Sequence, residues 1–250
     1  MLILITNDDG YDQPGLLELH RTLKREHELF SVAPLHHCSG ASQSLGLYSS
    51  MELRATGRNS WSLEGTPTDC VKIALMEVMK GRRPDLVISG INPGANLANN
   101  IFYSGTVAAA TEAALWDIPS IAVSVSVNSP EEPPAFRTAS RVLAEIMEHG
   151  LHQSIPHGAV LNVNVPELEY EELSGYRWTR MGRFADDIAF RQLEPGRVFS
   201  YDRYCALPVT DPSGSDVEAV ENGFVSLTLL NSDRTLPHDP VDTELTRGGA

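Results

Sequence analysis

Two adjacent aspartates follow the first apolar run of the chain. The run is Leu2–Ile5, and the turn after it reads Asn7-Asp8-Asp9-Gly10. An unbroken apolar run suits a strand that is buried on both faces of a parallel sheet. In open α/β sheets, ligands bind in the crevice beyond the carboxyl ends of the strands. The sequence therefore predicts an α/β fold with an acidic site at the edge of its sheet.

Asp8 and Asp9 are candidates for a metal site. Two carboxylates close together repel each other unless a proton or a cation lies between them, and their hard oxygen atoms suit Mg²⁺ or Mn²⁺. The alternative is a plain polar turn, because turns favour Asn, Asp and Gly for local reasons. The residues alone leave both interpretations open.

Composition limits the partners that the chain can bind. It has 250 residues, 42% of them hydrophobic, and a net charge of −14. Nucleic acids and anionic membranes are held mainly through Lys and Arg, so we expect neither a DNA or RNA duplex nor a membrane as partner. The first residues lack the basic region and the long apolar core that are typical of a signal peptide, and the three cysteines are far apart in the sequence, which fits reduced thiols. We therefore expect a cytoplasmic protein.

Strand-like and helix-like segments alternate as far as Pro166. After it, helical periodicity fades and strand-like pieces appear at residues 176–180, 198–204 and 224–230. We therefore expect a core over residues 1–166 and a β-rich extension over residues 167–250. In the core we expect helices at 14–26, 70–80, 107–116 and 135–149, strands at 29–33, 85–89, 120–126 and 160–165, and a β-hairpin over 45–64.

A second polar segment follows the expected strand at residues 85–89. It runs through residues 90–96 and ends at Ser104-Gly105-Thr106, where a helix of strong helix formers begins. The N–H groups at a helix N-terminus bind anions, so a phosphate would fit there. The alternative is that Ser104 or Thr106 only caps the helix.

Five motifs occur in a fixed order along the chain. They are Asn7–Gly10, Gly65–Cys70, Pro84–Asn92, Tyr103–Val107 and Leu161–Pro166. Together they resemble the SurE family, the stationary-phase survival nucleotidases. The resemblance implies a Rossmann-like three-layer core with a mainly parallel sheet, and a C-terminal extension that is exchanged between subunits. Because the strands of this extension have no evident partner sheet and unpaired edges invite pairing with another chain, we expect a homodimer or a homotetramer.

The same resemblance implies a metal-dependent phosphatase. Such a 5′-nucleotidase hydrolyses nucleoside monophosphates with one divalent cation per subunit, Mg²⁺ or Mn²⁺, and activity on 3′-nucleotides and polyphosphate stays open. Asp8 would orient or deprotonate the attacking water, with Asp9 mainly a ligand. The family pattern implies that the metal ligands are Asp8, Asp9, Ser39 and Asn92, and that the substrate-binding residues are Asn96, Ser104, Gly105 and Thr106.

This chain departs from the family pattern at two places. It has Ala98-Asn99-Asn100 where the family usually has Gly-Asp-Asp, and Thr228-Leu229-Leu230 where the family has Thr-Pro-Leu. The first difference removes two negative charges beside the expected site, so we expect it to affect which substrate is preferred more than the chemistry itself.

Two other classes of protein compete with the nucleotidase hypothesis. A phospho-receiver module also has paired acids after its first strand, but it needs an acceptor Asp and a Lys after later strands. The expected strand at 85–89 ends in Ser89-Gly90, and no Lys follows the one at 120–126. A non-catalytic nucleotide-binding protein would use the same residues as the enzyme.

Overall fold

The computed structural model describes residues 1–127, 135–194, 198–208 and 213–235. No helix in these ranges is long and apolar enough to cross a membrane. The strands are β1 (Leu2–Thr6), β2 (Glu28–Pro34), β3 (Leu53–Gly57), β4 (Ser60–Leu63), β5 (Leu86–Pro93), β6 (Ser120–Val125), β7 (Ala159–Val165), β8 (Tyr176–Thr179), β9 (Phe184–Glu194), β10 (Val198–Pro208) and β11 (Val225–Asn231). The helices are α1 (Pro14–Leu23), α2 (Pro67–Ile73), α3 (Gly105–Leu115), α4 (Phe136–Glu148) and α5 (Asp216–Glu221). Shorter helical turns are η1 (Ala74–Val78), η2 (Ala98–Phe102), η3 (Leu151–Ser154) and η4 (Tyr170–Glu172).

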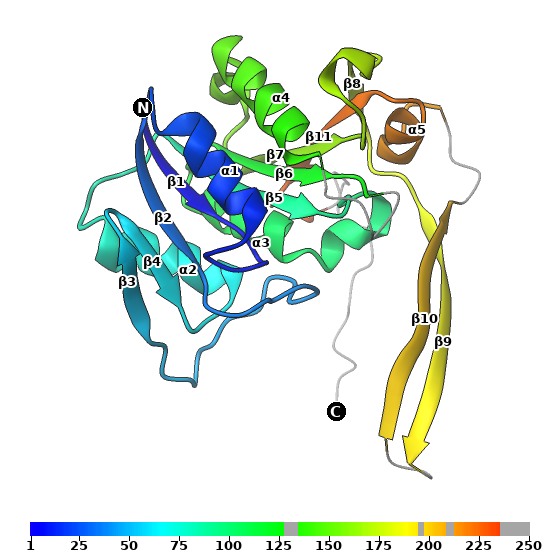
Figure 1. Ribbon diagram of the computed structural model, residues 1–250, viewed down its shortest axis with the longest axis horizontal. Helices are drawn as coiled ribbons and strands as arrows, with labels where there is room; N and C mark the ends of the chain where they lie inside the picture. The colour runs from blue at the N-terminus through cyan, green and yellow to red at the C-terminus, as the bar shows by residue number, and fades with distance from the viewer. Residues whose placement is uncertain (128–134, 195–197, 209–212, 236–250) are drawn as a thin grey trace, which may run out of the picture.

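One mainly parallel sheet forms the middle layer of the molecule (Figure 1). Within the described ranges it has nine strands, in the order β3-β4-β2-β1-β5-β6-β7-β11-β8. The pairs from β4 to β7 are parallel, whereas β3 pairs antiparallel with β4 and β11 pairs antiparallel with β7. Helices α1 and α4 cover one face, and α2 and α3 cover the other. This arrangement confirms the predicted three-layer α/β fold.

The first apolar run of the chain is the central strand β1. Ile3 and Ile5 pack into the core on the α1 and α4 side, and Leu4 packs into the core on the α2 and α3 side. All three are fully buried, because successive side chains of a strand point to opposite faces of the sheet. β1 pairs with β2 on one side and with β5 on the other. The strand order thus reverses at β1, which is where α/β proteins bind ligands.

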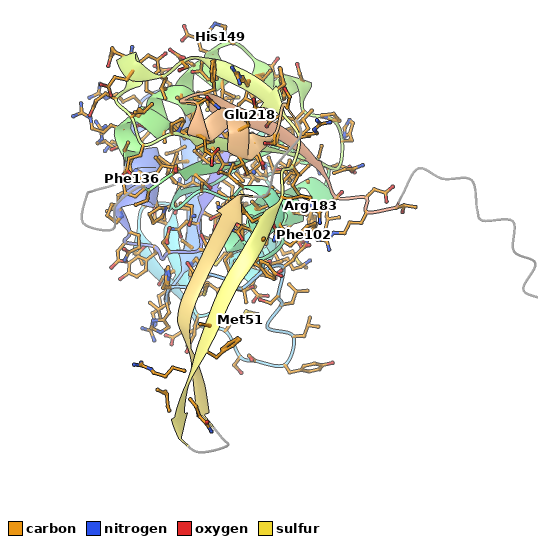
Figure 2. The ribbon with its side chains drawn as sticks, turned by 90° about the vertical axis from the view of Figure 1, so that its right-hand side faces the viewer. Met51, Phe102, Phe136, His149, Arg183 and Glu218 are labelled. Carbon is orange, nitrogen blue, oxygen red and sulfur yellow. The ribbon has the colours of Figure 1, made fainter. Side chains whose placement is uncertain are left out.

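The segment after Pro166 contributes to the main sheet. Strands occur where the sequence predicts them, as β8, β10 and β11. β11 lies between β7 and β8, and its residues Val225 and Leu227 are buried in the same core as Ile3. In contrast, β9 and β10 pair only with each other within the described ranges and project from the body as a long hairpin (Figures 1 and 2). The sequence shows no partner for β11 because its partner β7 lies far away in the chain.

Two predicted elements have different bounds in the structure. Residues 45–52 form turns and bends, so the hairpin begins at Leu53. Leu47 is 72% exposed and Tyr48 is fully exposed, so the middle of this segment packs on no core, whereas Met51 near its end packs against the core on the α2 side. The helix predicted over residues 70–80 is α2, which starts at Pro67, and it passes into the π-helical turn η1 after Ile73.

Candidate active site

The turn after β1 is closed by hydrogen bonds within the turn. Asn7 Nδ2 donates to the Gly10 carbonyl oxygen at 2.9 Å, and the Gly10 N–H donates to Asn7 Oδ1 at 3.2 Å. Gly10 has a φ of +131°, a conformation that residues with a side chain rarely adopt. The turn places Asp8 and Asp9 at the carboxyl edge of the sheet.

The carboxylate of Asp8 lies against the first turn of α3. Thr106 Oγ1 donates to Asp8 Oδ1 at 2.5 Å, and the Thr106 backbone N–H also donates to this carboxylate. Asp8 is 3% exposed and Thr106 is fully buried. The close approach depends on Gly105, because a Cβ at this position would lie 2.7 Å from Asp8 Cβ and 2.9 Å from Asp8 Oδ2. The structure therefore brings Asp8, Gly105 and Thr106 together.

Both acids hold a proton more strongly than an ordinary aspartate. Burial raises the pKa of Asp8, although hydrogen bonds from Thr106 oppose this effect. Burial, followed by the charge of Asp8, raises the pKa of Asp9 to about 7. The side chain of Asp9 is 9% exposed and faces His37, whose Nδ1 lies 3.5 Å from Asp9 Oδ1. The pair therefore favours a proton, or a cation in its place.

Ser39 and Asn92 lie on the two segments that flank these acids. Ser39 is exposed and follows Cys38, whose N–H donates to the backbone carbonyl of Asp8 at 2.7 Å. Asn92 is partly buried, and its Nδ2 donates to the Gly94 carbonyl at 2.6 Å. Because this bond occupies the amide nitrogen, Oδ1 is the Asn92 atom that can bind a cation.

A β-bulge in β5 carries Asn92 to the edge of the sheet. The pairing of β5 with β6 shifts register between Ser89 and Asn92. Gly90 lies in this shift, and a Cβ there would meet the Val123 carbonyl oxygen at 2.3 Å. Bulges re-aim the side chains that follow them, so a residue without a Cβ is required before Asn92.

The predicted ligand set suits a hard divalent cation. Within the described ranges, no three His, Cys, Asp or Glu side chains form a cluster that could hold a metal. The predicted ligands instead combine two carboxylates with a hydroxyl and an amide, which is an all-oxygen set of the kind that Mg²⁺ accepts together with water. The raised pKa values of Asp8 and Asp9 fit this interpretation, because a cation would offset the cost of burying two charged carboxylates and the repulsion between them.

Ser104 and Asn96 are largely buried, each with its own hydrogen bonds. Ser104 is the N-cap of α3, and its Oγ accepts from the Val107 N–H at 3.1 Å. Asn96 Nδ2 donates to Ser124 Oγ at 2.7 Å. Ser104 therefore caps α3, which is one of the two roles that the sequence left open for it. The contacts of Ser104 and Asn96 with phosphate stay predictions.

Two asparagines of β7 hold the backbone of Asn96. Asn162 Nδ2 and Asn164 Nδ2 donate to the Asn96 carbonyl at 2.9 and 3.1 Å, and Asn164 Oδ1 accepts from the Asn96 N–H at 2.7 Å. Both β7 asparagines therefore hold the loop that follows β5.

Sequence reasoning does not single out Asp216, which supports the loop after Asn96. Asp216 is fully buried, and its Oδ2 accepts from the Ala98 N–H at 2.9 Å while its Oδ1 accepts from the Gly182 N–H at 2.8 Å. The only local signal is an acid in the first turn of a short helix, which is typical of ordinary capping. Its contact with residue 98 depends on the tertiary fold.

Comparisons with known proteins identify the family. The family described as "Survival protein SurE" matches residues 3–187. A relative from Alkalilimnicola ehrlichii, named 5′-nucleotidase SurE, is 39% identical over 237 residues, which are 94% of this chain and 91% of the relative. The chain belongs to the SurE family. The crystal structure of the SurE protein from Aquifex aeolicus has a TM-score of 0.82 and 35% identity, and the match covers 94% of this chain and 95% of that one.

The departure of this SurE protein at residues 98–100 falls within η2. Asn99 Oδ1 accepts from the Phe184 N–H at 2.7 Å, which ties η2 to the start of β9. Ala98 has a φ of +49° and donates its N–H to Asp216. The two asparagines of this segment therefore lie on a loop that the C-terminal part of the chain holds in place.

Removing the Asp9 carboxylate should stabilise the metal-free protein at alkaline pH. In the folded state its pKa is about 7, against an ordinary value of 3.8. A carboxyl group whose pKa is higher in the folded state than in the unfolded state destabilises the fold increasingly as the pH rises from the unfolded-state pKa to the folded-state pKa. Above the folded-state pKa, the loss of stability is complete. We expect Asp9→Asn, measured in chelator, to melt at a higher temperature than wild type at pH 8, with the difference vanishing toward pH 4.

Asp12→Asn is the matched control, because Asp12 is an exposed carboxylate in the same turn. A lower melting temperature for Asp9→Asn at pH 8, or an equal gain for Asp12→Asn, would contradict the raised pKa of Asp9 that burial and the charge of Asp8 produce.

Proposed function

We propose that this SurE protein is a 5′-nucleotidase that depends on a divalent cation and hydrolyses nucleoside monophosphates to nucleoside and inorganic phosphate. Family membership and the name of the relative support nucleotidase activity. The observation that carries the proposal is the Asp8–Asp9 pair at the point where the strand order reverses, with Asp8 buried against the first turn of α3 and Asp9 partly buried beside it. This edge combines an acidic cation site with an anion site.

Asp8, Asp9, Ser39 and Asn92 would hold Mg²⁺ or Mn²⁺, one ion per subunit. A bound cation of this kind offsets phosphate charge and lowers the pKa of a bound water. Asp8 would orient the attacking water or take its proton, because Thr106 holds its carboxylate in a fixed place. Asp9 would serve mainly as a ligand.

The N-terminus of α3 would bind the phosphate. Its N–H groups and dipole favour negative charge, and this charge increases on the equatorial oxygens during phosphoryl transfer. Thr106 already donates to Asp8, and Val107 donates to Ser104. The phosphate would therefore share the Thr106 donors with Asp8 and the Val107 N–H with Ser104. The Ser104 hydroxyl and the Gly105 N–H would also donate to it, and Asn96 would bind it from the neighbouring loop.

A phosphate-release assay tests the function and separates it from nucleotide binding without turnover. We expect the wild type to release phosphate from nucleoside 5′-monophosphates with Mn²⁺ or Mg²⁺ and to lose activity in chelator. Asp8→Asn and Asp9→Asn each delete a ligand, so both should nearly abolish release and keep the fold, whereas Asp12→Asn should retain it. Near wild-type rates for Asp9→Asn after chelation would refute the metal assignment, and 3′-nucleotides and polyphosphate in the same panel define the range of substrates.

The phosphate site can be separated from helix capping. Ser104→Ala removes a cap worth about 1 kcal/mol of stability and a phosphate donor worth roughly 1.5 to 3 kcal/mol. We expect kcat/KM to fall by about one to two decades. Ser215→Ala is the matched control, because Ser215 caps α5 through the same contact, with its Oγ 3.0 Å from the Glu218 nitrogen. Equal kcat/KM in Ser104→Ala and Ser215→Ala would mean that Ser104 only caps α3 and does not bind the phosphate.

We also propose that residues 1–166 carry the metal and phosphate residues and that the extension over residues 167–250 joins subunits into a homodimer or homotetramer by exchange of its projecting β9–β10 hairpin, since β8 and β11 belong to the main sheet. The projecting hairpin supports this, because a lone hairpin is marginal in water and open strand edges pair readily (Figure 2). A cytoplasmic location fits the free thiols of Cys38 and Cys70. The side chain of Cys205 lies outside the described part of the chain.

Light scattering at low micromolar concentration tests the assembly. Phe190 and Leu193 of β9 are 59% and 53% exposed, so changing both to Ser should lower the molar mass of the particle if the hairpin binds another subunit. The control changes Leu47 and Tyr48 to Ser, since both are more exposed apolar residues outside the hairpin. A fully active wild-type monomer would rule the proposal out.

A further inference from the structure

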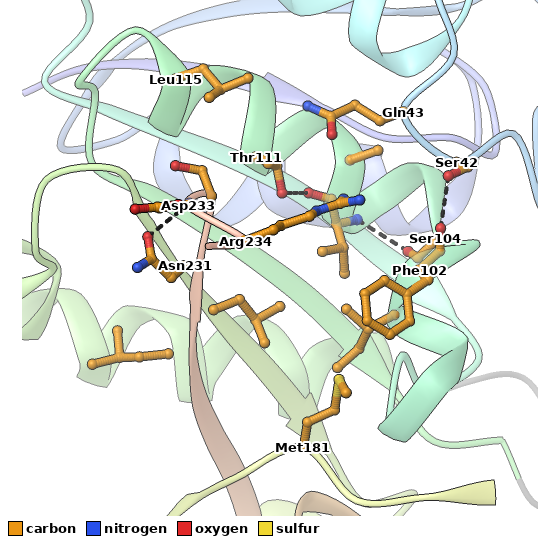
Figure 3. A pocket seen from close by; sticks show the side chains of 16 residues that line it. Ser42, Gln43, Phe102, Ser104, Thr111, Leu115, Met181, Asn231, Asp233 and Arg234 are labelled. Carbon is orange, nitrogen blue, oxygen red and sulfur yellow. Dashed lines mark hydrogen bonds between the residues drawn. The ribbon is translucent and has the colours of Figure 1, made fainter. Parts of the chain in front are cut away.

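A cavity of about 310 Å³ opens beside Ser104 (Figure 3). Its walls come from the outer side of α3, from η2 and from the segment after β11. Its volume falls at the lower end of the range of small-molecule sites, and its walls combine apolar and polar side chains as such sites do. The apolar lining includes Phe102, Val107, Leu115, Met181 and Leu230, and the polar lining includes Ser42, Gln43, Thr111, Asn231 and Arg234.

The cavity and the candidate active site share a wall. Ser104 lines the cavity and caps α3 two residues before Thr106, which holds Asp8. Ser42, three residues after Ser39, ties this loop to the cavity wall, because its Oγ donates to the Phe102 carbonyl at 2.7 Å and its N–H donates to the Tyr103 carbonyl at 3.0 Å. A ligand whose phosphate lies at the N-terminus of α3 could therefore extend into this cavity.

The cavity offers the groups that recognise a planar base. The ring of Phe102 is 50% exposed, although a large apolar side chain is usually covered. The Arg234 guanidinium lies 5.9 Å from the centre of this ring, and both groups point into the cavity in Figure 3. Aromatic rings and guanidinium planes stack on bases, and amide side chains such as those of Gln43 and Asn231 can bond to base edges.

We propose that this cavity binds the nucleoside part of the substrate, with the base stacked on Phe102 beside Arg234. The inference rests on the proposed function, since it takes the phosphate position from the Asp8 site. Arg234 also supplies a positive charge within the cavity, which the carboxylate of Asp233 lines as well. Specificity for nucleotides over other phosphate esters then comes from Phe102 and Arg234, outside the predicted metal and phosphate ligands.

A comparison of nucleoside 5′-monophosphates with ribose 5-phosphate tests the proposal, because ribose 5-phosphate lacks the base. Phe102→Leu keeps an apolar side chain and removes the stacking face. We expect it to lower kcat/KM for the nucleotides about tenfold or more and to change kcat/KM for ribose 5-phosphate less than twofold. Phe102→Tyr should retain the wild-type preference, and Arg234→Gln should weaken it. Trp178→Ala is the control, because Trp178 is a similarly exposed aromatic residue, 56% exposed, on β8.

Calorimetric titration with adenosine and uridine tests the cavity without phosphate chemistry. Binding to the wild type that is lost in Phe102→Leu supports the proposal even if no nucleotide is hydrolysed, in which case only the proposed function fails. Nucleosides that do not bind, or that bind both proteins equally, would overturn the proposal. If Phe102→Leu lowers kcat/KM equally for nucleotides and for ribose 5-phosphate, the proposal is overturned and the cavity serves packing. If Phe102→Leu changes the molar mass of the particle and leaves the preference for nucleotides over ribose 5-phosphate unchanged, the proposal is overturned and the cavity serves subunit contact.

Discussion

The contact between the Asp8 carboxylate and the first turn of α3 determines how the rest of the site is built. It requires a helix end close to the end of β1, and two features of α3 permit this. Gly105 has no Cβ to strike Asp8, and the buried side chains that follow are mostly alanine, which lets the helix approach the sheet closely. The helix then supplies donors for Asp8 and a positive dipole end at the same edge.

Local signals in the sequence predict the elements that form this edge. The run Leu2–Ile5 is fully apolar because β1 is covered on both faces, and an acidic turn after such a strand is visible without a structure. Thr66 and Asp69 likewise form the capping box that starts α2. The metal and phosphate residues depend on the resemblance to the SurE family, because the residues alone also fit a polar turn and a simple helix cap.

Contacts between distant segments explain what the sequence does not predict. β11 pairs with β7 although a long stretch of chain separates the two strands. Val225 and Leu227 of β11 are buried apolar residues, and their identity does not indicate which strand they pair with. Asp216 reaches the backbone of Ala98 from a helix of only six residues. The C-terminal part of the chain therefore has a second role, because it holds the loop between Asn92 and Ser104. This loop connects the predicted metal ligand to the predicted phosphate site.

Charge decides how such a site can work in a protein whose net charge is −14. Without a cation, burial raises the pKa of both Asp8 and Asp9, and the charge of Asp8 raises the pKa of Asp9 further, so the edge is either partly protonated or negative. Neither state attracts a phosphate dianion, and the dipole of one helix equals only about half a charge. Under the proposed function, a divalent cation must therefore bind before or with the substrate. Arg234 lines the neighbouring cavity together with Asp233, so its positive charge there does not depend on a bound metal.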